Sequence, residues 1–100
     1  MSSFYAIFKL IGLSIAVEVN TNRGRIDCVV ETDDRICIIE FKLNGSKKEA
    51  LQQIIDKQYA QRYQQHGKQI VMIGVEFDKA SRNIGGFMLN EYSNGNYHPR

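Results

Sequence analysis

The 100-residue sequence lacks the features that mark secreted, fibrous or membrane-spanning proteins. Its two cysteines are too few to define a disulfide framework. A single proline and the absence of low-complexity stretches exclude a proline-rich linker. No run of about 18 uncharged apolar residues is present, so no segment is expected to cross a membrane. The apolar start of the chain is interrupted by Lys9 and lacks a small-residue cleavage pattern, which argues against a secretory signal. These absences predict a cytoplasmic protein.

The composition is that of one ordinary globular domain. Hydrophobic residues make up 43% and charged residues 24%, which excludes a disordered chain. The 100 residues leave room for one domain. The net charge is +2, which neither indicates nor excludes a nucleic-acid partner, because the position of the charges decides that question.

The apolar pattern predicts an α-β-β-β-α-β-β order of elements. Phe4, Ile7, Phe8 and Ile11 recur at the spacing of an amphipathic helix. A second, long helix is expected over 47–66, after a Ser-x-x-Glu capping box and before a glycine. The domain is expected to span 4–92, and the polar tail 93–100 to be frayed. The expected strands are 15–20, 25–31, 36–43, 69–76 and 84–92.

Three acidic residues fall in one row if the first three strands form two antiparallel hairpins with tight turns. Glu18 then faces Asp27, and Asp27 faces Glu40 on the next strand. Side chains alternate along a strand, so Lys42 lies on the same face as Glu40. Neighbouring carboxylates destabilise a sheet unless something positive compensates them. The row therefore predicts a binding site for a cation.

Oxygen ligands grouped with a lysine suit Mg²⁺ or Mn²⁺, which keep water molecules for a phosphate-containing substrate. The chemistry that this set favours is metal-assisted hydrolysis, in which Lys42 orients water or stabilises negative charge. A Glu-x-Lys pattern alone is common, and the simpler interpretation is a solvated acidic surface. The hairpin geometry and the apolar neighbours of Glu40 favour a site.

Two segments, Gly24–Asp27 and Ile38–Lys42, resemble the D…E-x-K core of the PD-(D/E)XK nuclease superfamily. Residues 50–54 and 73–77 add a resemblance to the nuclease-like domain often found C-terminal to an AAA-ATPase-like domain in bacterial proteins. The resemblance implies an α/β restriction-endonuclease-like fold, an α-β-β-β-α-β core with a central mixed sheet flanked by helices. Ile26 stands where the motif has proline.

The resemblance also implies roles for single residues. The catalytic set would be Asp27, Glu40 and Lys42, and the ligands of Mg²⁺ or Mn²⁺ would be Glu18, Asp27 and Glu40. Relatives carry a Gln-x-x-x-Tyr helix motif, whereas here Gln53 lies six residues before the tyrosine, so it ranks below the carboxylates. Expected nucleic-acid contacts are Arg23, Arg25, Lys47, Lys48, Gln53 and Tyr59.

The sequence therefore predicts a magnesium-dependent nuclease that hydrolyses phosphodiester bonds of nucleic acid, with DNA as the expected partner. An ATPase-like domain in the full-length protein and a homodimer are further expectations. One alternative is a catalytically silent nuclease-like module that binds nucleic acid or protein. Another is a purely structural dimerisation domain.

Overall fold

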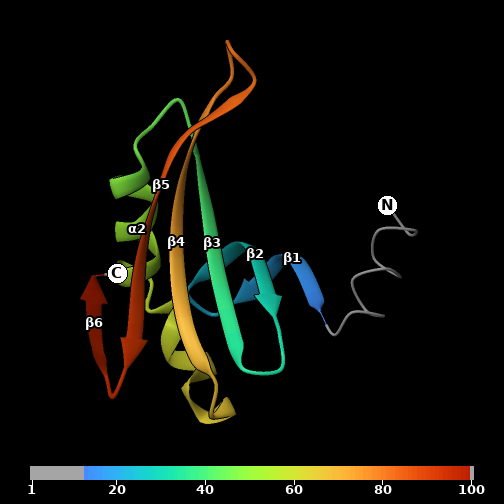
Figure 1. The fold of residues 1–100 in the computed structure, drawn as a ribbon, viewed down its shortest axis with the longest axis vertical. Helices are drawn as coiled ribbons and strands as arrows, with labels where there is room; N and C mark the ends of the chain where they lie inside the picture. The colour runs from blue at the N-terminus through green and yellow to red at the C-terminus, as the bar shows by residue number, and fades with distance from the viewer. Residues whose placement is uncertain (1–12, 100) are drawn as a thin grey trace.

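The computed structural model describes residues 13–99, so the helix expected over 4–11 lies outside the described residues. Within this range six strands form one sheet in the order β1-β2-β3-β4-β5-β6 (Figure 1). No helix in it is both long and apolar enough to span a membrane. The elements are β1 Ser14–Thr21, β2 Gly24–Glu31, β3 Arg35–Leu43, α2 Lys47–Asp56, the 3₁₀ helix η1 Tyr59–His66, β4 Gln69–Asp78, β5 Asn83–Ser93 and β6 Asn96–Pro99.

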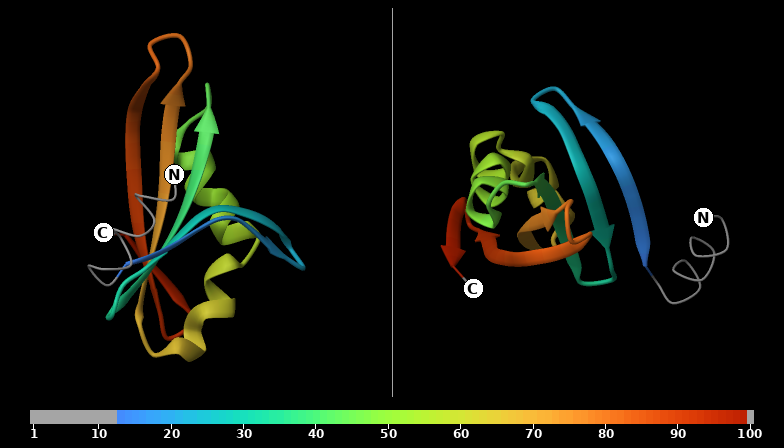
Figure 2. Two further views of the ribbon diagram at one scale, coloured as in Figure 1. Left: turned by 90° about the vertical axis from the view of Figure 1, so that its right-hand side faces the viewer. Right: turned by 90° about the horizontal axis from the view of Figure 1, so that it is seen from above.

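The sheet is mixed. β3 and β4 are parallel, and α2 and η1 provide the crossover between them, as parallel strands require. All other neighbours are antiparallel. The sheet is curved, and both helices lie on its concave side (Figure 2). This arrangement agrees with the predicted α/β architecture in the part of the chain that the structure describes.

The core fills the space between α2 and the strands that it covers. Alternate residues of β3, Ile36 and Ile38, are fully buried, as is Met72 on β4. They pack in one cluster with Leu51 and Ile54 of α2. The helix starts where the capping box predicts, since Ser46 and Glu49 each accept the other's backbone N–H.

Gly74 on β4 sets how closely α2 approaches the sheet. A Cβ atom built there would lie 2.3 Å from the carbonyl oxygen of Lys47 and 2.5 Å from the backbone nitrogen of Leu51. Both are backbone atoms of the helix, which cannot rotate away. Glycine at this position therefore permits the helix-sheet packing on which the core depends.

The prediction of one continuous helix over 47–66 is wrong. α2 ends at Asp56, Gln58 takes a left-handed conformation with φ 56°, and the chain continues as η1. The physical reason is packing, because the break turns Tyr59 and Ala60 into the core, where they are 2% and 0% exposed. No glycine or proline marks the break, so tertiary contacts override the local preference for helix.

The prediction of a frayed tail after Tyr92 is also wrong. Asn96–Pro99 forms β6, which pairs with the end of β5, and the ring of Tyr97 packs 5.0 Å from that of Tyr92. Asn94 and Gly95 between the strands have φ values of 52° and 80°. Two consecutive positive φ angles are the signature of a tight hairpin turn, for which Asn-Gly is the preferred sequence.

Candidate active site

The two hairpins have the predicted registers. In β1–β2 the pairs on both sides of Glu18 and Asp27 place these two residues across from one another. In β2–β3 the ladder ends one pair before Asp27 and Glu40, with the register that brings them side by side. The three acidic positions therefore follow one another across three strands, as the turns predict.

Asp27 and Glu40 join the two strands where the ladder has ended. The backbone N–H of Asp27 donates to Oε1 of Glu40 at 3.1 Å. The backbone N–H of Phe41 donates to Oδ2 of Asp27 at 2.9 Å. Each carboxylate thus accepts a backbone hydrogen bond from the opposite strand. These two hydrogen bonds hold the side chain of Asp27 against β3 and the side chain of Glu40 against β2.

Glu40 is a buried acid with an altered proton affinity. Its residue is only 3% exposed, and no other charged residue among 13–99 is buried. Burial raises the pKa of Glu40 to about 7, and the neighbouring charge of Asp27 adds to the rise. The Asp27 N–H and the Lys42 ammonium act in the opposite direction. A buried carboxylate beside a second one is a common feature of functional sites.

Gln53 supports this carboxylate from α2. Its Nε2 donates to Oε2 of Glu40 at 3.2 Å, so both oxygens of the glutamate have a donor. The residue was expected among the nucleic-acid contacts and ranked below the carboxylates. The structure instead places it directly on the acid, where it fixes the side-chain orientation.

Tyr59 lies beneath the site rather than on the surface, which corrects the expectation that it contacts nucleic acid. Its hydroxyl donates to the carbonyl oxygen of Arg25 at 3.3 Å. Burial raises the pKa of Tyr59, and the charges of Glu40 and Asp27 raise it further. The hydroxyl lies 2.7 Å from where a Cβ of Gly24 would be, so this turn needs glycine.

A cavity of about 330 Å³ is lined by Gln53, the hydrogen-bond partner of Glu40, although neither Asp27 nor Glu40 lines it. Lys42 of β3 lines one side of it, and residues of α2 line the other: Glu49, Gln52, Gln53, Asp56 and Lys57. A Cβ on Gly45 would lie 2.3 Å from Cγ of Lys42, so the lysine stem packs against this loop. The cavity gives solvent and a ligand access to the side of the site that carries Lys42.

Glu18 stands apart from the acidic pair. Its backbone has φ 52°, and its exposed side chain lies 3.9 Å from the guanidinium of Arg25. Within residues 13–99, no three His, Cys, Asp or Glu side chains gather closely enough to hold a metal ion by themselves. The structure therefore brings Asp27 and Glu40 together and leaves Glu18 with Arg25.

The remaining basic residues lie around the site, and Arg25 pairs with Glu18 rather than with Asp27 or Glu40. Arg23 and Arg25 are exposed on the β1–β2 hairpin, and Lys48 is exposed at the start of α2. The backbone N–H of Lys47 donates to Oε2 of Glu76 at 2.9 Å. Glu76 is a contact that the sequence reasoning missed, although the register of β4 places it next to Lys42. Its carboxylate caps the N-terminal end of α2, where negative charge is favourable.

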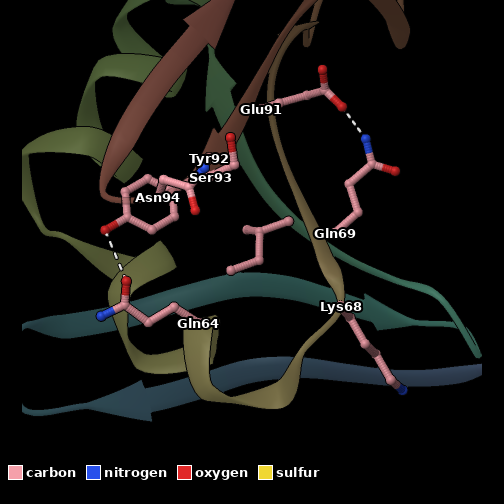
Figure 3. Close-up of a pocket in the computed structure, with 8 residues that line it drawn as sticks. Gln64, Lys68, Gln69, Glu91, Tyr92, Ser93 and Asn94 are labelled. Carbon is pink, nitrogen blue, oxygen red and sulfur yellow. Dashed lines mark hydrogen bonds between the residues drawn. The ribbon is translucent and has the colours of Figure 1, made fainter.

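A second cavity, of about 310 Å³, lies at the other end of the sheet. In it Tyr92 donates to the side-chain oxygen of Gln64, and Gln69 donates to Glu91 (Figure 3). Lys68 at its edge is engaged by Glu31 at 2.7 Å. Four of its polar side chains are paired with one another, and neither Asp27 nor Glu40 lines it, so it is not the candidate active site.

Comparison with known proteins identifies the family. A model of the PD-(D/E)XK nuclease superfamily matches residues 1–87. The chain belongs to this superfamily. A protein of Azotobacter chroococcum mcd 1, named "Uncharacterized protein in vnfD 5'region", is 39% identical over 90 residues, which cover 88% of the chain and 17% of that protein. The chain thus spans under a fifth of the length of this relative. No solved structure matches the chain.

Membership of the PD-(D/E)XK superfamily confirms the predicted fold class, since the mixed six-stranded sheet with helices is consistent with a restriction-endonuclease-like domain. Nucleases of this superfamily generally use divalent metals. The residues here fit such an ion, because the carboxylates of Asp27 and Glu40 lie side by side and offer oxygen atoms as metal ligands. The cost of burying Glu40, visible in its raised pKa, is what a cation would relieve.

Proposed function

We propose that this domain is a magnesium-dependent nuclease that hydrolyses phosphodiester bonds of DNA. The observation that carries the proposal is the buried Glu40, bonded to Asp27 on one side and to Gln53 on the other. A structural ion pair would not explain this arrangement, because both fixed groups carry the same sign of charge. A site for a cation explains it.

Each residue has a distinct role in the proposal. Asp27 and Glu40 hold the metal, and Mn²⁺ can replace Mg²⁺ because both prefer oxygen ligands. A bound divalent cation supplies Lewis-acid polarisation of the phosphodiester. Lys42, which shares the cavity with Gln53, positions a water molecule or stabilises the negative charge that develops on the phosphate. Glu18 serves as an added acid only after it leaves Arg25.

Cations of the β1–β2 hairpin and of the start of α2 provide the contacts to the DNA backbone, and all of them except the half-buried Lys47 are exposed. Arg23 and Arg25 occupy the β1–β2 hairpin, while Lys47 and Lys48 begin α2. Such contacts position the substrate without reading its sequence. An ATPase-like partner domain belongs to the proposal on the family resemblance, and a cytoplasmic location on the sequence features that argue against secretion and membrane insertion.

A cleavage assay with purified protein tests the proposal. DNA and RNA, each single-stranded and duplex, are incubated with Mg²⁺, with Mn²⁺ and with EDTA. We expect metal-dependent cleavage of DNA that is lost in Asp27→Asn and Lys42→Ala. Lys79→Ala is the matched control, because Lys79 is an exposed lysine in the turn after β4. It should cleave like the wild type.

The alternative outcome is informative. If no metal supports cleavage and the wild type still binds DNA in a salt-dependent manner that survives Asp27→Asn, the domain is a binding module. Cleavage that persists unchanged in Lys42→Ala would contradict the role assigned to the lysine. Cleavage of RNA alone would overturn the choice of DNA.

A further inference from the structure

The loop 44–46, which joins β3 to α2, lies against the side chain of Lys42. A Cβ atom built on Gly45 would lie 2.3 Å from Cγ of Lys42 and 3.3 Å from its Cβ. These atoms form the base of the lysine side chain rather than its flexible end. Gly45 and the lysine stem are therefore in direct contact, and their spacing leaves no room for a Cβ at position 45.

The loop is anchored on both sides of Gly45. The backbone N–H of Asn44 donates to a carbonyl oxygen of β4 at 2.9 Å, and its side-chain oxygen accepts from a backbone N–H of the turn after β4 at 3.3 Å. Ser46 is held by the capping box of α2. Because β4 and the helix fix the loop, a Cβ at position 45 is accommodated by movement of Lys42.

The backbone conformation of Gly45 does not by itself require glycine. Its φ angle is not positive, unlike those of Gly24, Gly67 and Gly95. Alanine can adopt a negative φ without strain. A substitution at position 45 therefore acts through the contact with the stem of Lys42 and not through backbone strain.

Lys42 leads from this contact to the cavity that Gln53 also lines. The lysine is half-buried and lies on the side of the cavity opposite α2. Burial raises the pKa of Glu40, and the ammonium of Lys42 opposes that rise, which agrees with a position near the carboxylate. Rotation about the Cα–Cβ bond of Lys42 moves Cγ and every atom beyond it. The contact at the stem therefore sets where the ammonium lies.

We propose that Gly45 is a positioning residue, which lets the loop 44–46 close on the stem of Lys42 and so holds the lysine ammonium at the cavity. The inference rests on the proposed nuclease function, in which this ammonium acts on water or on the phosphate. In Gly45→Ala the new Cβ turns the lysine stem into another rotamer and carries the ammonium away. Misplacement of a reacting group by about 1 Å costs about 100-fold in rate, so kcat should fall at least about tenfold.

Two measurements on Gly45→Ala test the role of the loop. The first is the rate of amine acetylation at Lys42, followed by mass spectrometry in EDTA and compared with that of Lys68 at the other end of β4. It should rise, because the stem loses its packing. The second is the cleavage assay, in which kcat should fall. The rise in melting temperature on addition of Mg²⁺ should stay that of the wild type, because the substitution leaves the acidic pair in place.

The control is Gly67→Ala. A Cβ on Gly67 meets nothing within 4 Å, although its φ of 71° makes alanine unfavourable there. This variant should therefore lose stability while its kcat and its acetylation rate at Lys42 stay those of the wild type. It separates a general loss of stability from a change in the position of the lysine.

A double-mutant cycle in urea covers a Gly45→Ala protein that folds poorly. Its loss of stability should shrink in the Lys42→Ala background, because alanine has no Cγ for the new Cβ to meet. An equal loss in both backgrounds would overturn the proposal. So would a folded Gly45→Ala protein whose acetylation rate at Lys42, or whose kcat, equals that of the wild type. A wild type that cleaves no nucleic acid would refute the nuclease function alone, since acetylation and the cycle still decide the position of the lysine.

Discussion

Replacing Glu40 with glutamine should make the metal-free protein more stable at alkaline pH and, at the same time, abolish its response to Mg²⁺. The folded protein raises the pKa of this residue from 4.5 to about 7. Because the folded pKa is the higher one, stability falls as pH rises from about 4.5 to about 7 and then stays constant. The difference is worth about 3 kcal/mol, at about 1.4 kcal/mol per pKa unit.

The substitution removes this cost but also one hydrogen bond. Glutamine keeps an oxygen for the N–H of Asp27, whereas its amide nitrogen replaces the oxygen that accepts from Gln53. A lost hydrogen bond costs about 1 kcal/mol, so the net gain above pH 7 is about 2 kcal/mol. For a domain of this size, that raises the melting temperature by about 10 °C.

Thermal denaturation in EDTA, followed by circular dichroism from acidic to alkaline pH, measures the effect. Near pH 4.5 Glu40→Gln should melt slightly below the wild type, because only the lost hydrogen bond remains, and its melting temperature should overtake that of the wild type as the pH rises toward 7. With excess Mg²⁺ only the wild type should gain stability, which narrows the gap. Glu18→Gln is the control. Because Glu18 is exposed, this variant should melt at the same temperature as the wild type in EDTA at every pH. A Glu40→Gln protein less stable than wild type at alkaline pH would refute the reasoning.

Three further predictions concern packing and charge. Gly74→Ala should lower the free energy of unfolding, measured in urea, by about 3 kcal/mol or more, because the new Cβ meets the α2 backbone. Gly67→Ala should lower it by only about 1 kcal/mol, because there is open space around Gly67 and the cost comes from its φ of 71°. Tyr59→Phe should lower urea stability by about 1 kcal/mol through its lost hydrogen bond, without a change in fold. The hydrogen bond from Lys68 lowers the pKa of Glu31, so the stability advantage of wild type over Glu31→Gln should shrink as pH falls below about 4.5.

The acidic pair could be predicted from sequence because short turns fix the register of hairpins. The turns after β1 and β2 leave little freedom, so counting outward from them places Asp27 beside Glu40. The role of Gln53 could not be predicted in this way. The sequence argument compares the positions of Gln53 and Tyr59 on one continuous helix. The break at Gln58 changes the direction of the chain before Tyr59, so the two residues do not lie on one helix. The sequence around Gln58 contains no glycine or proline that would indicate this break.

The difference between local turn signals and long-range contacts also explains the wrong prediction of a frayed C-terminal tail. The turn of the β5–β6 hairpin has a recognisable signal, Asn94-Gly95, which composition alone conceals because the whole tail is polar. Its strand is held by Tyr97 against Tyr92 and by the hydrogen bond from Gln61 to the Tyr97 hydroxyl. Those partners lie in η1 and β5, so the contact that orders the tail depends on the completed fold.

The site forms where the β2–β3 ladder stops, and this position has a physical cause. The β2–β3 backbone pairing ends at Cys28 and Ile39, and buried backbone N–H groups beyond that point need other acceptors. The N–H groups of Asp27 and Phe41 each bind the acid of the opposite strand. Gln53 and Tyr59, on either side of the helix break, then support the acid and the hairpin from below. The end of the β2–β3 pairing and the break between α2 and η1 therefore act on the same site. Together they position the donors that hold the carboxylates of Asp27 and Glu40 next to each other.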